Sequence, residues 1–147
     1  MSIVIDYFIK TLLAGLGTLC FAVIFCVPRR HYLAALFTGA IGYFVYMLMI
    51  DMQLSVSIAT LFATVVLTLF SRIFSIYQKA PITIFLFCGI FPLVPGAGIY
   101  YTALYFMQGD MSLFVEKGAE TIKIALALAV GISFIIGIPF PKLNKKD

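Results

Sequence analysis

Five apolar runs, separated by short polar or proline-containing segments, occupy most of the chain. A helix that rises about 1.5 Å per residue can cross about 30 Å of hydrocarbon with runs of this length. The runs are continuously apolar, which excludes the alternating strands of a membrane barrel. The pattern predicts an all-α, polytopic membrane protein with one transmembrane domain over residues 1–147. Its five spanning helices are expected at residues 3–27, 33–50, 54–77, 82–107 and 121–138.

Composition agrees with a membrane environment. Hydrophobic residues make up 63% of the chain and charged residues 11%, against about 45–50% and about 25% in soluble domains. So few charges cannot cover a soluble domain, and so high a hydrophobicity excludes intrinsic disorder. The lipid bilayer is therefore a predicted partner. The net charge of +4 comes from scattered residues, so nucleic acid is not an expected partner.

The positive charges favour one orientation. With five crossings, seven Lys and Arg residues fall on one side of the membrane and three on the other. Cytoplasmic loops carry the excess of positive charge. The sequence predicts a multi-pass cell-membrane protein with its N-terminus outside and its C-terminus in the cytoplasm. The seven residues expected on the cytoplasmic side are Arg29, Arg30, Arg72, Lys79, Lys142, Lys145 and Lys146.

The fourth run contains the most informative segment, PLVPGAG at residues 92–98. Pro92 and Pro95 each remove a backbone donor and clash with the preceding helical turn, and Gly96 and Gly98 add backbone freedom. Irregular backbone is tolerated in a membrane only where it faces protein or water. We therefore expect the fourth helix to be broken at this segment, as in secondary transporters that bind their substrates at discontinuous helices.

The second half of the broken helix would present free N–H groups and a partial positive charge to a carboxylate. Tyrosine hydroxyls follow within two turns and can donate hydrogen bonds. The alternative is a simple proline kink beside tyrosines that only pack. The candidate substrate-binding residues are Pro92, Pro95, Gly96, Gly98 and Tyr101.

Ionisable residues inside a membrane are functional candidates, and the predicted spans contain few. Asp51 ends the second run and is either a proton-coupling group or an interfacial helix terminus. The segment 108–120, which carries two Glu residues, Asp110 and Lys117, is interpreted as a solvated acidic loop. Small residues within the spans are expected to mark close helix contacts, among them Gly15, Gly17, Gly39, Gly131 and Gly137.

Few residues in the chain suit metal or catalytic chemistry. His31 is the only histidine, and the three cysteines lie in apolar runs without a CxxC spacing. The spans contain no Ser/Lys pair, paired aspartates or metal-binding histidines of the kind that intramembrane enzymes use. We therefore expect no metal, no cofactor, no catalytic residue and no enzymatic activity.

The PLVPGAGIYYT segment, the Gly109-Asp110 pair that follows it, and the Pro-Phe-Pro before the basic tail resemble the threonine/serine exporter family. The chain is similar to the short membrane subunit that corresponds to the C-terminal half of that exporter. The resemblance implies a subunit of a secondary exporter of small polar organic acids, with threonine and serine as substrates. It also implies a partner, the longer subunit that supplies the second membrane half.

Two alternatives remain open at this stage. A split pair of this type is also associated with export of succinate, a dicarboxylate, and the chain is alternatively a non-transporting scaffold subunit. The predicted topology favours a transporter, because five spans that start outside are inverted relative to a five-span partner that starts inside. Two such halves would form an inverted repeat with the substrate site between them.

Overall fold

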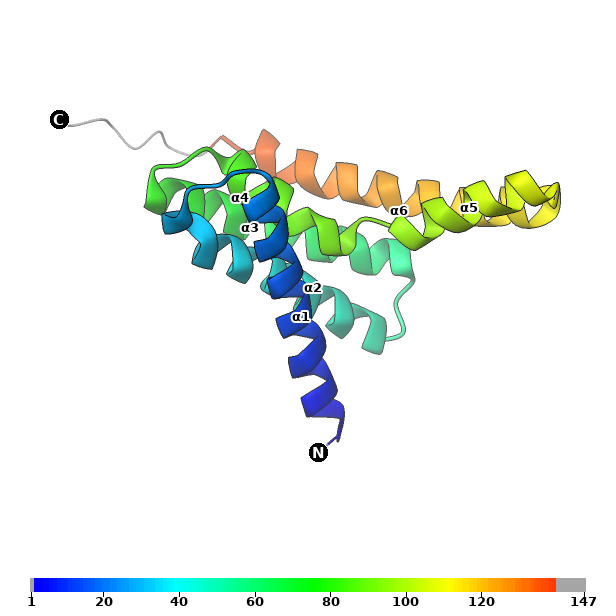
Figure 1. The fold of residues 1–147 in the computed structure, drawn as a ribbon, viewed down its shortest axis with the longest axis horizontal. Helices are drawn as coiled ribbons and strands as arrows, with labels where there is room; N and C mark the ends of the chain where they lie inside the picture. The colour runs from blue at the N-terminus through cyan, green and yellow to red at the C-terminus, as the bar shows by residue number, and fades with distance from the viewer. Residues whose placement is uncertain (1, 140–147) are drawn as a thin grey trace.

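The structure is a computed structural model that describes residues 2–139. The regular elements in this range are all helical, and the basic tail with Lys142, Lys145 and Lys146 lies outside it. Within this range the long helices are α1, α2, α3 and α6, and the shorter helices α4 and α5 form a bent pair joined through the short helix η2 (Figure 1). The elements are α1 (Ser2–Ile24), η1 (Arg29–His31), α2 (Tyr32–Asp51), α3 (Val56–Gln78), α4 (Ile82–Ile90), η2 (Phe91–Leu93), α5 (Gly96–Gln108) and α6 (Met111–Gly137).

Four of the helices are long and apolar enough to cross a membrane, and the bent pair qualifies as a fifth span. The two halves of this pair meet at an angle of 54°. The all-α, polytopic fold with a break in the fourth span is therefore confirmed. The break lies at the predicted prolines, because neither ring nitrogen can donate to the helix ladder.

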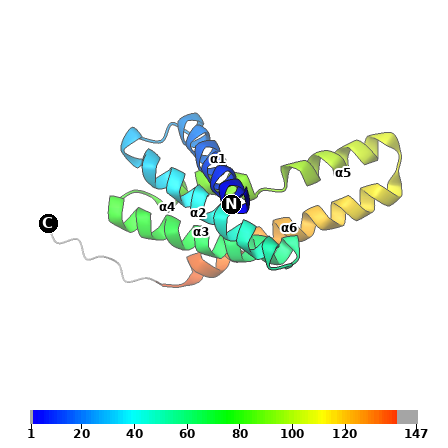
Figure 2. The same cartoon turned by 90° about the horizontal axis from the view of Figure 1, so that it is seen from below.

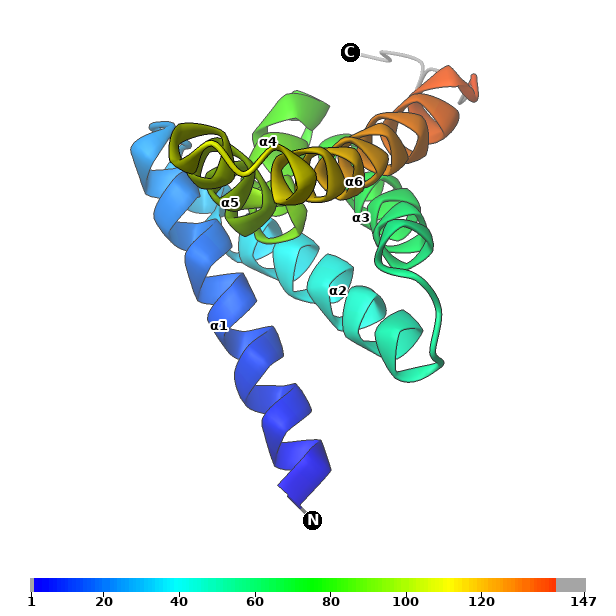
Figure 3. The ribbon, with the colours of Figure 1, turned by 90° about the vertical axis from the view of Figure 1, so that its right-hand side faces the viewer.

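Most of the helices pack against the helix that precedes or follows them in the chain. α2 packs between α1 and α3, α4 packs across α2 and α3, and the C-terminal half of α6 packs against α3. Figure 3 shows α1 and α2 close together at their connecting turn and spread apart towards the N-terminus of α1. A cleft that Asp51 lines lies between the diverging parts of α1 and α2.

A stripe of hydroxyl side chains lies inside the bundle on α3. Thr60, Thr64, Thr68 and Ser71 are at most 1% exposed. Each hydroxyl donates to the backbone carbonyl four residues earlier, at 2.7–2.9 Å. These short side chains satisfy their own hydrogen bonds and leave room for close helix contact. Gly131 of α6 uses that room, because a Cβ on it would lie 2.9 Å from the Cβ of Thr64.

α5 and residues 111–123 of α6 form an antiparallel hairpin, which we call the arm. The arm extends beyond the other helices at one end of the molecule (Figures 1 and 2). α6 is the main packing partner of α5 among the helices. No residue of α5 is buried by the part of the chain that the structure describes. The arm therefore lacks the second packing layer that the other helices have.

The interpretation of residues 108–120 as a loop is wrong, because α6 already begins at Met111. Gly109 ends α5 with a φ of +78°, in the left-handed region that favours glycine. The carboxylate of Asp110 then accepts a hydrogen bond from the N–H of Leu113 at 3.1 Å and caps α6. These two residues complete the turn, so the charges that follow are carried on a helix.

Candidate functional site

The break between α4 and α5 leaves backbone donors free. The N–H of Gly96 donates to the Val94 carbonyl at 2.7 Å, and that of Ile99 donates to the Pro95 carbonyl at 3.0 Å. Within residues 2–139, no carbonyl or side chain accepts a hydrogen bond from the N–H of Ala97 or Gly98. The start of α5 therefore presents two free donors together with the positive end of its dipole.

These donors border a pocket of about 380 Å³ between α5 and α6, which we call the break pocket. Its volume lies in the range of roughly 300–1,000 Å³ that is typical of small-molecule sites. Residues 95–105 contribute one wall, and residues 117–124 of α6 contribute the other. The lining residues are Pro95, Ala97, Gly98, Tyr101, Tyr105, Lys117, Glu120, Thr121 and Ile124.

Gly98 sets the spacing of the two walls. A Cβ on Gly98 would lie 2.5 Å from the hydroxyl oxygen of Thr121, a distance that a real side chain cannot accept. The Thr121 hydroxyl donates to the Lys117 carbonyl at 2.7 Å, and the Thr102 hydroxyl donates to the Gly98 carbonyl at 2.7 Å. Glycine is therefore required here for the close approach of the two helices.

An ion pair lies on the α6 wall of the break pocket. The ammonium of Lys117 is 3.0 Å from a carboxylate oxygen of Glu120, and both side chains are partly exposed. Sequence reasoning missed this pair because it assigned both residues to a loop. The signal was their i, i+3 spacing, which places two side chains on the same face of a helix.

The tyrosines after the break form a short ladder along α5. The rings of Tyr101 and Tyr105 stack with their centroids 6.3 Å apart, and both line the break pocket. Tyr100 contacts the edge of Tyr101 and is 62% exposed. Tyr101 and Tyr105 thus bring phenolic hydroxyls to the α5 wall.

The structure brings together three of the five predicted binding residues. Pro95, Gly98 and Tyr101 line the break pocket. Gly96 begins α5 beside that pocket, and a Cβ on it would meet no atom within 4 Å. Pro92 instead lines a separate groove of about 370 Å³. The two prolines of the PLVPGAG segment therefore face two different cavities.

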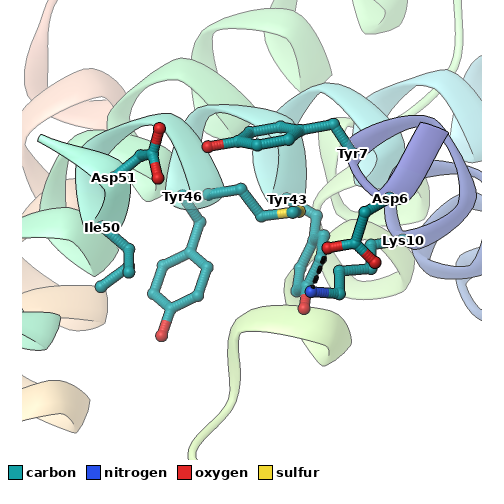
Figure 4. A pocket seen from close by; sticks show the side chains of 8 residues that line it. Asp6, Tyr7, Lys10, Tyr43, Tyr46, Ile50 and Asp51 are labelled. Carbon is teal, nitrogen blue, oxygen red and sulfur yellow. Dashed lines mark ion pairs between the residues drawn. The ribbon is translucent and has the colours of Figure 1, made fainter. Parts of the chain in front are cut away.

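Asp51, which the sequence offered as either a proton-coupling group or an interfacial helix terminus, does not line the break pocket. It lines a cleft of about 780 Å³ between α1 and α2 (Figure 4). The cleft also contains the ion pair between Lys10 and Asp6, whose charged atoms are 2.7 Å apart. The sequence pattern did not predict that these three residues line one cavity.

Over residues 2–139, no three His, Cys, Asp or Glu side chains gather closely enough to hold a metal ion. In the part of the chain that the structure describes, the charged side chains that line the break pocket are those of Lys117 and Glu120. With the free N–H groups of α5, this set can bind a small solute that carries both signs of charge.

Comparison with known sequence families finds a match over most of the chain. A sequence-family model described as "Threonine/Serine exporter, ThrE" matches residues 10–138 of the chain. The match includes the break, the arm and most of the α1–α2 cleft. No solved structure matches the chain.

Proposed function

The chain belongs to the threonine/serine exporter family, and on that premise we propose that it is one membrane half of a secondary exporter of threonine and serine. The observation that carries the proposal is the break pocket, which combines free backbone donors, a cation, a carboxylate and hydroxyl groups. Discontinuous helices of this kind hold substrates in other secondary transporters.

The substrate in this proposal is a zwitterion. Its carboxylate accepts hydrogen bonds from the N–H groups of Ala97 and Gly98 and pairs with Lys117, while its ammonium group pairs with Glu120. The side-chain hydroxyl of threonine or serine contacts the hydroxyl of Tyr101. Charge-assisted hydrogen bonds of this type contribute about 1.5–3 kcal/mol each, so both charges of the substrate matter for affinity.

The charge of the break pocket supports an amino acid over a dicarboxylate. A second carboxylate, as in succinate, would lie against Glu120 instead of the favourable ammonium group. Succinate export therefore becomes the less favoured alternative. Glu120 is expected to favour an amino acid over a dicarboxylate. A substitution of Glu120 therefore tests the proposed substrate.

The exposed arm supports a second membrane half. Free N–H groups in lipid cost several kcal/mol each, so the start of α5 needs protein or water beside it. The described part of this chain buries no residue of α5. In the proposal the longer subunit covers the arm, and its own bundle moves relative to this one during transport. A scaffold subunit would not need a polar pocket at a broken helix.

The orientation with the N-terminus outside is supported by the position of the basic turns. η1 with Arg29 and Arg30 lies at the same end of the molecule as the α3–α4 turn with Lys79 (Figure 1). The side chains of His31 and Gln78 connect the two turns by a hydrogen bond. Positive charges gathered at one end favour that end as the cytoplasmic side of the cell membrane.

The experiment measures export by the chain reconstituted with its longer partner subunit in vesicles. Glu120→Gln is expected to lower threonine and serine export about tenfold or more, corresponding to one lost charge-assisted interaction of about 1.5–3 kcal/mol. Succinate flux should not fall. Glu116→Gln is the matched control, because Glu116 lies on the same helix outside the break pocket.

Normal threonine export by Glu120→Gln, at the same level in the membrane as the control, would reject the break pocket as the substrate site. Vesicles with either subunit alone test the two-part arrangement. Flux from the longer subunit by itself, at the full rate, would instead identify this chain as a scaffold.

A further inference from the structure

The α1–α2 cleft holds three charged residues of the membrane-spanning helices. Asp6 and Lys10 come from the first turns of α1, and Asp51 ends α2. Figure 4 shows the Tyr7 hydroxyl pointing towards the Asp51 carboxylate, and tyrosines of α2 complete the wall. These residues lie near the ends of their helices, where charged side chains can face water or a ligand.

The charges of the cleft do not balance. Lys10 pairs with Asp6 at 2.7 Å, whereas Asp51 forms no ion pair with any residue in the range 2–139. The cleft therefore carries one carboxylate without a cation. An ammonium group of a ligand would compensate it. Lys10 has three N–H donors, so it can hold Asp6 and a second carboxylate at once.

The cleft continues towards the break. Lys10 and Tyr43 line both the α1–α2 cleft and the groove that contains Pro92. This groove, which we call the connecting groove, runs along α1 past Gly17 to Phe91 of η2. The rings of Phe21 and Phe91 stack at 3.8 Å across its inner end. The two cavities thus share walls and lead from the open end of α1 and α2 to the broken helix.

We propose that the α1–α2 cleft is a second binding site for the zwitterionic amino acid, in which Lys10 binds the carboxylate and Asp51 binds the ammonium group. The connecting groove links this site to the break, so the cleft serves as the vestibule of the transport route. The inference rests on the proposed function for the identity of the solute. It concerns a different set of residues and has its own readout.

Gly17 gives a direct test of the connecting groove. A Cβ on Gly17 would meet no atom within 4 Å, so Gly17→Leu starts in open space and adds an apolar side chain at the wall of the groove. We expect this variant to insert normally and to export threonine at least tenfold more slowly. Gly137→Leu is the matched control, since Gly137 is equally open and lines neither the groove nor the cleft. Export by Gly17→Leu at the rate of the control would overturn the groove as the route.

Binding in the cleft is tested by cysteine protection. In a chain with Cys20, Cys26 and Cys88 replaced by alanine, Met47→Cys places a thiol on the cleft wall. A water-soluble thiosulfonate, applied from either face of the membrane, should modify this thiol, and threonine should slow the reaction at least threefold. Leu48→Cys is the control, because Leu48 is exposed on the outside of α2 and does not line the cleft.

The same labelling in the Lys10→Gln variant should show no protection by threonine. An unreactive Met47→Cys thiol, or a reaction that threonine does not slow, would overturn the proposal. The second result is also expected if a lipid headgroup occupies the cleft. Because labelling reports binding without flux, this failure is distinguishable from failure of the break pocket, which the Glu120→Gln export assay reports.

Discussion

Gly98 of α5 and Thr121 of α6 touch so closely that a Cβ on the glycine would lie 2.5 Å from the threonine hydroxyl oxygen. The contact lies in the wall of the break pocket. It fixes the distance between the free N–H groups of α5 and the ion pair on α6. The geometry of the candidate site therefore depends on one helix–helix contact.

Gly98→Ala is predicted to push α5 away from α6 and to reduce export strongly. Overpacking of this kind costs about 1–3 kcal/mol. Thr121→Ala removes the hydroxyl that the new methyl group meets, so the double variant Gly98→Ala/Thr121→Ala should regain most of the stability lost by Gly98→Ala. Thermal unfolding of the wild type, the two single variants and the double variant in detergent gives the interaction energy of this double-mutant cycle. Additive effects of the two substitutions would show that the contact is not the cause.

A second close contact holds α1 against α2. A Cβ on Gly39 would lie 1.8 Å from the Thr18 hydroxyl oxygen, which itself donates to the Ala14 carbonyl at 2.9 Å. Gly39→Ala is therefore predicted to destabilise the bundle by about 1–3 kcal/mol or more. Gly137→Ala meets no neighbour within 4 Å and should change the unfolding temperature little. Equal stability of the two variants would contradict the packing of α1 on α2.

The hydrogen bond between His31 and Gln78 joins the α1–α2 turn to the end of α3. His31 is 2% exposed, its Nδ1 faces the Gln78 side-chain oxygen, and its Nε2 accepts from Arg30 Nε at 2.9 Å. Gln78→Leu leaves a buried ring N–H without its acceptor, at a cost of about 1–3 kcal/mol. Unfolding of Gln78→Leu should begin at a lower temperature than that of the wild type. Gln53→Leu, at the α2–α3 turn, is the control and should leave the unfolding temperature nearly unchanged. A wild-type unfolding curve for Gln78→Leu would argue against this connection.

A substitution of Asp51 distinguishes substrate binding from proton coupling. If Asp51 binds the ammonium group of the substrate, Asp51→Asn should raise the threonine concentration for half-maximal export about tenfold, the effect of about 1.4 kcal/mol. The response of export to a proton gradient should then persist. If Asp51 couples transport to protons instead, the variant should lose that response. Export assays in vesicles with and without an imposed pH gradient distinguish the two.

The helix contacts were only partly predictable from the sequence. Small residues were expected to mark them, and Gly39 and Gly131 do lie against side chains on neighbouring helices. Gly17 and Gly137, chosen by the same rule, have open space where a side chain would be. A glycine in an apolar run does not indicate which side of its helix faces a neighbour. That choice depends on how the helices rotate against one another.

What the sequence by itself determined is the helical membrane fold and the position of its break. Both follow from local chemistry, since apolar runs of this length cross lipid as helices and Pro92 and Pro95 cannot donate to a helix ladder. Only the tertiary structure decided which cavities the charges line. Lys117 and Glu120 line the break pocket because α6 starts at Met111 and folds back along α5. Lys10 and Asp51 share a cleft because α1 and α2 diverge from a common turn. The cavity that each charge lines depends on how the helices pack against one another, which the spacing of residues along the chain does not encode.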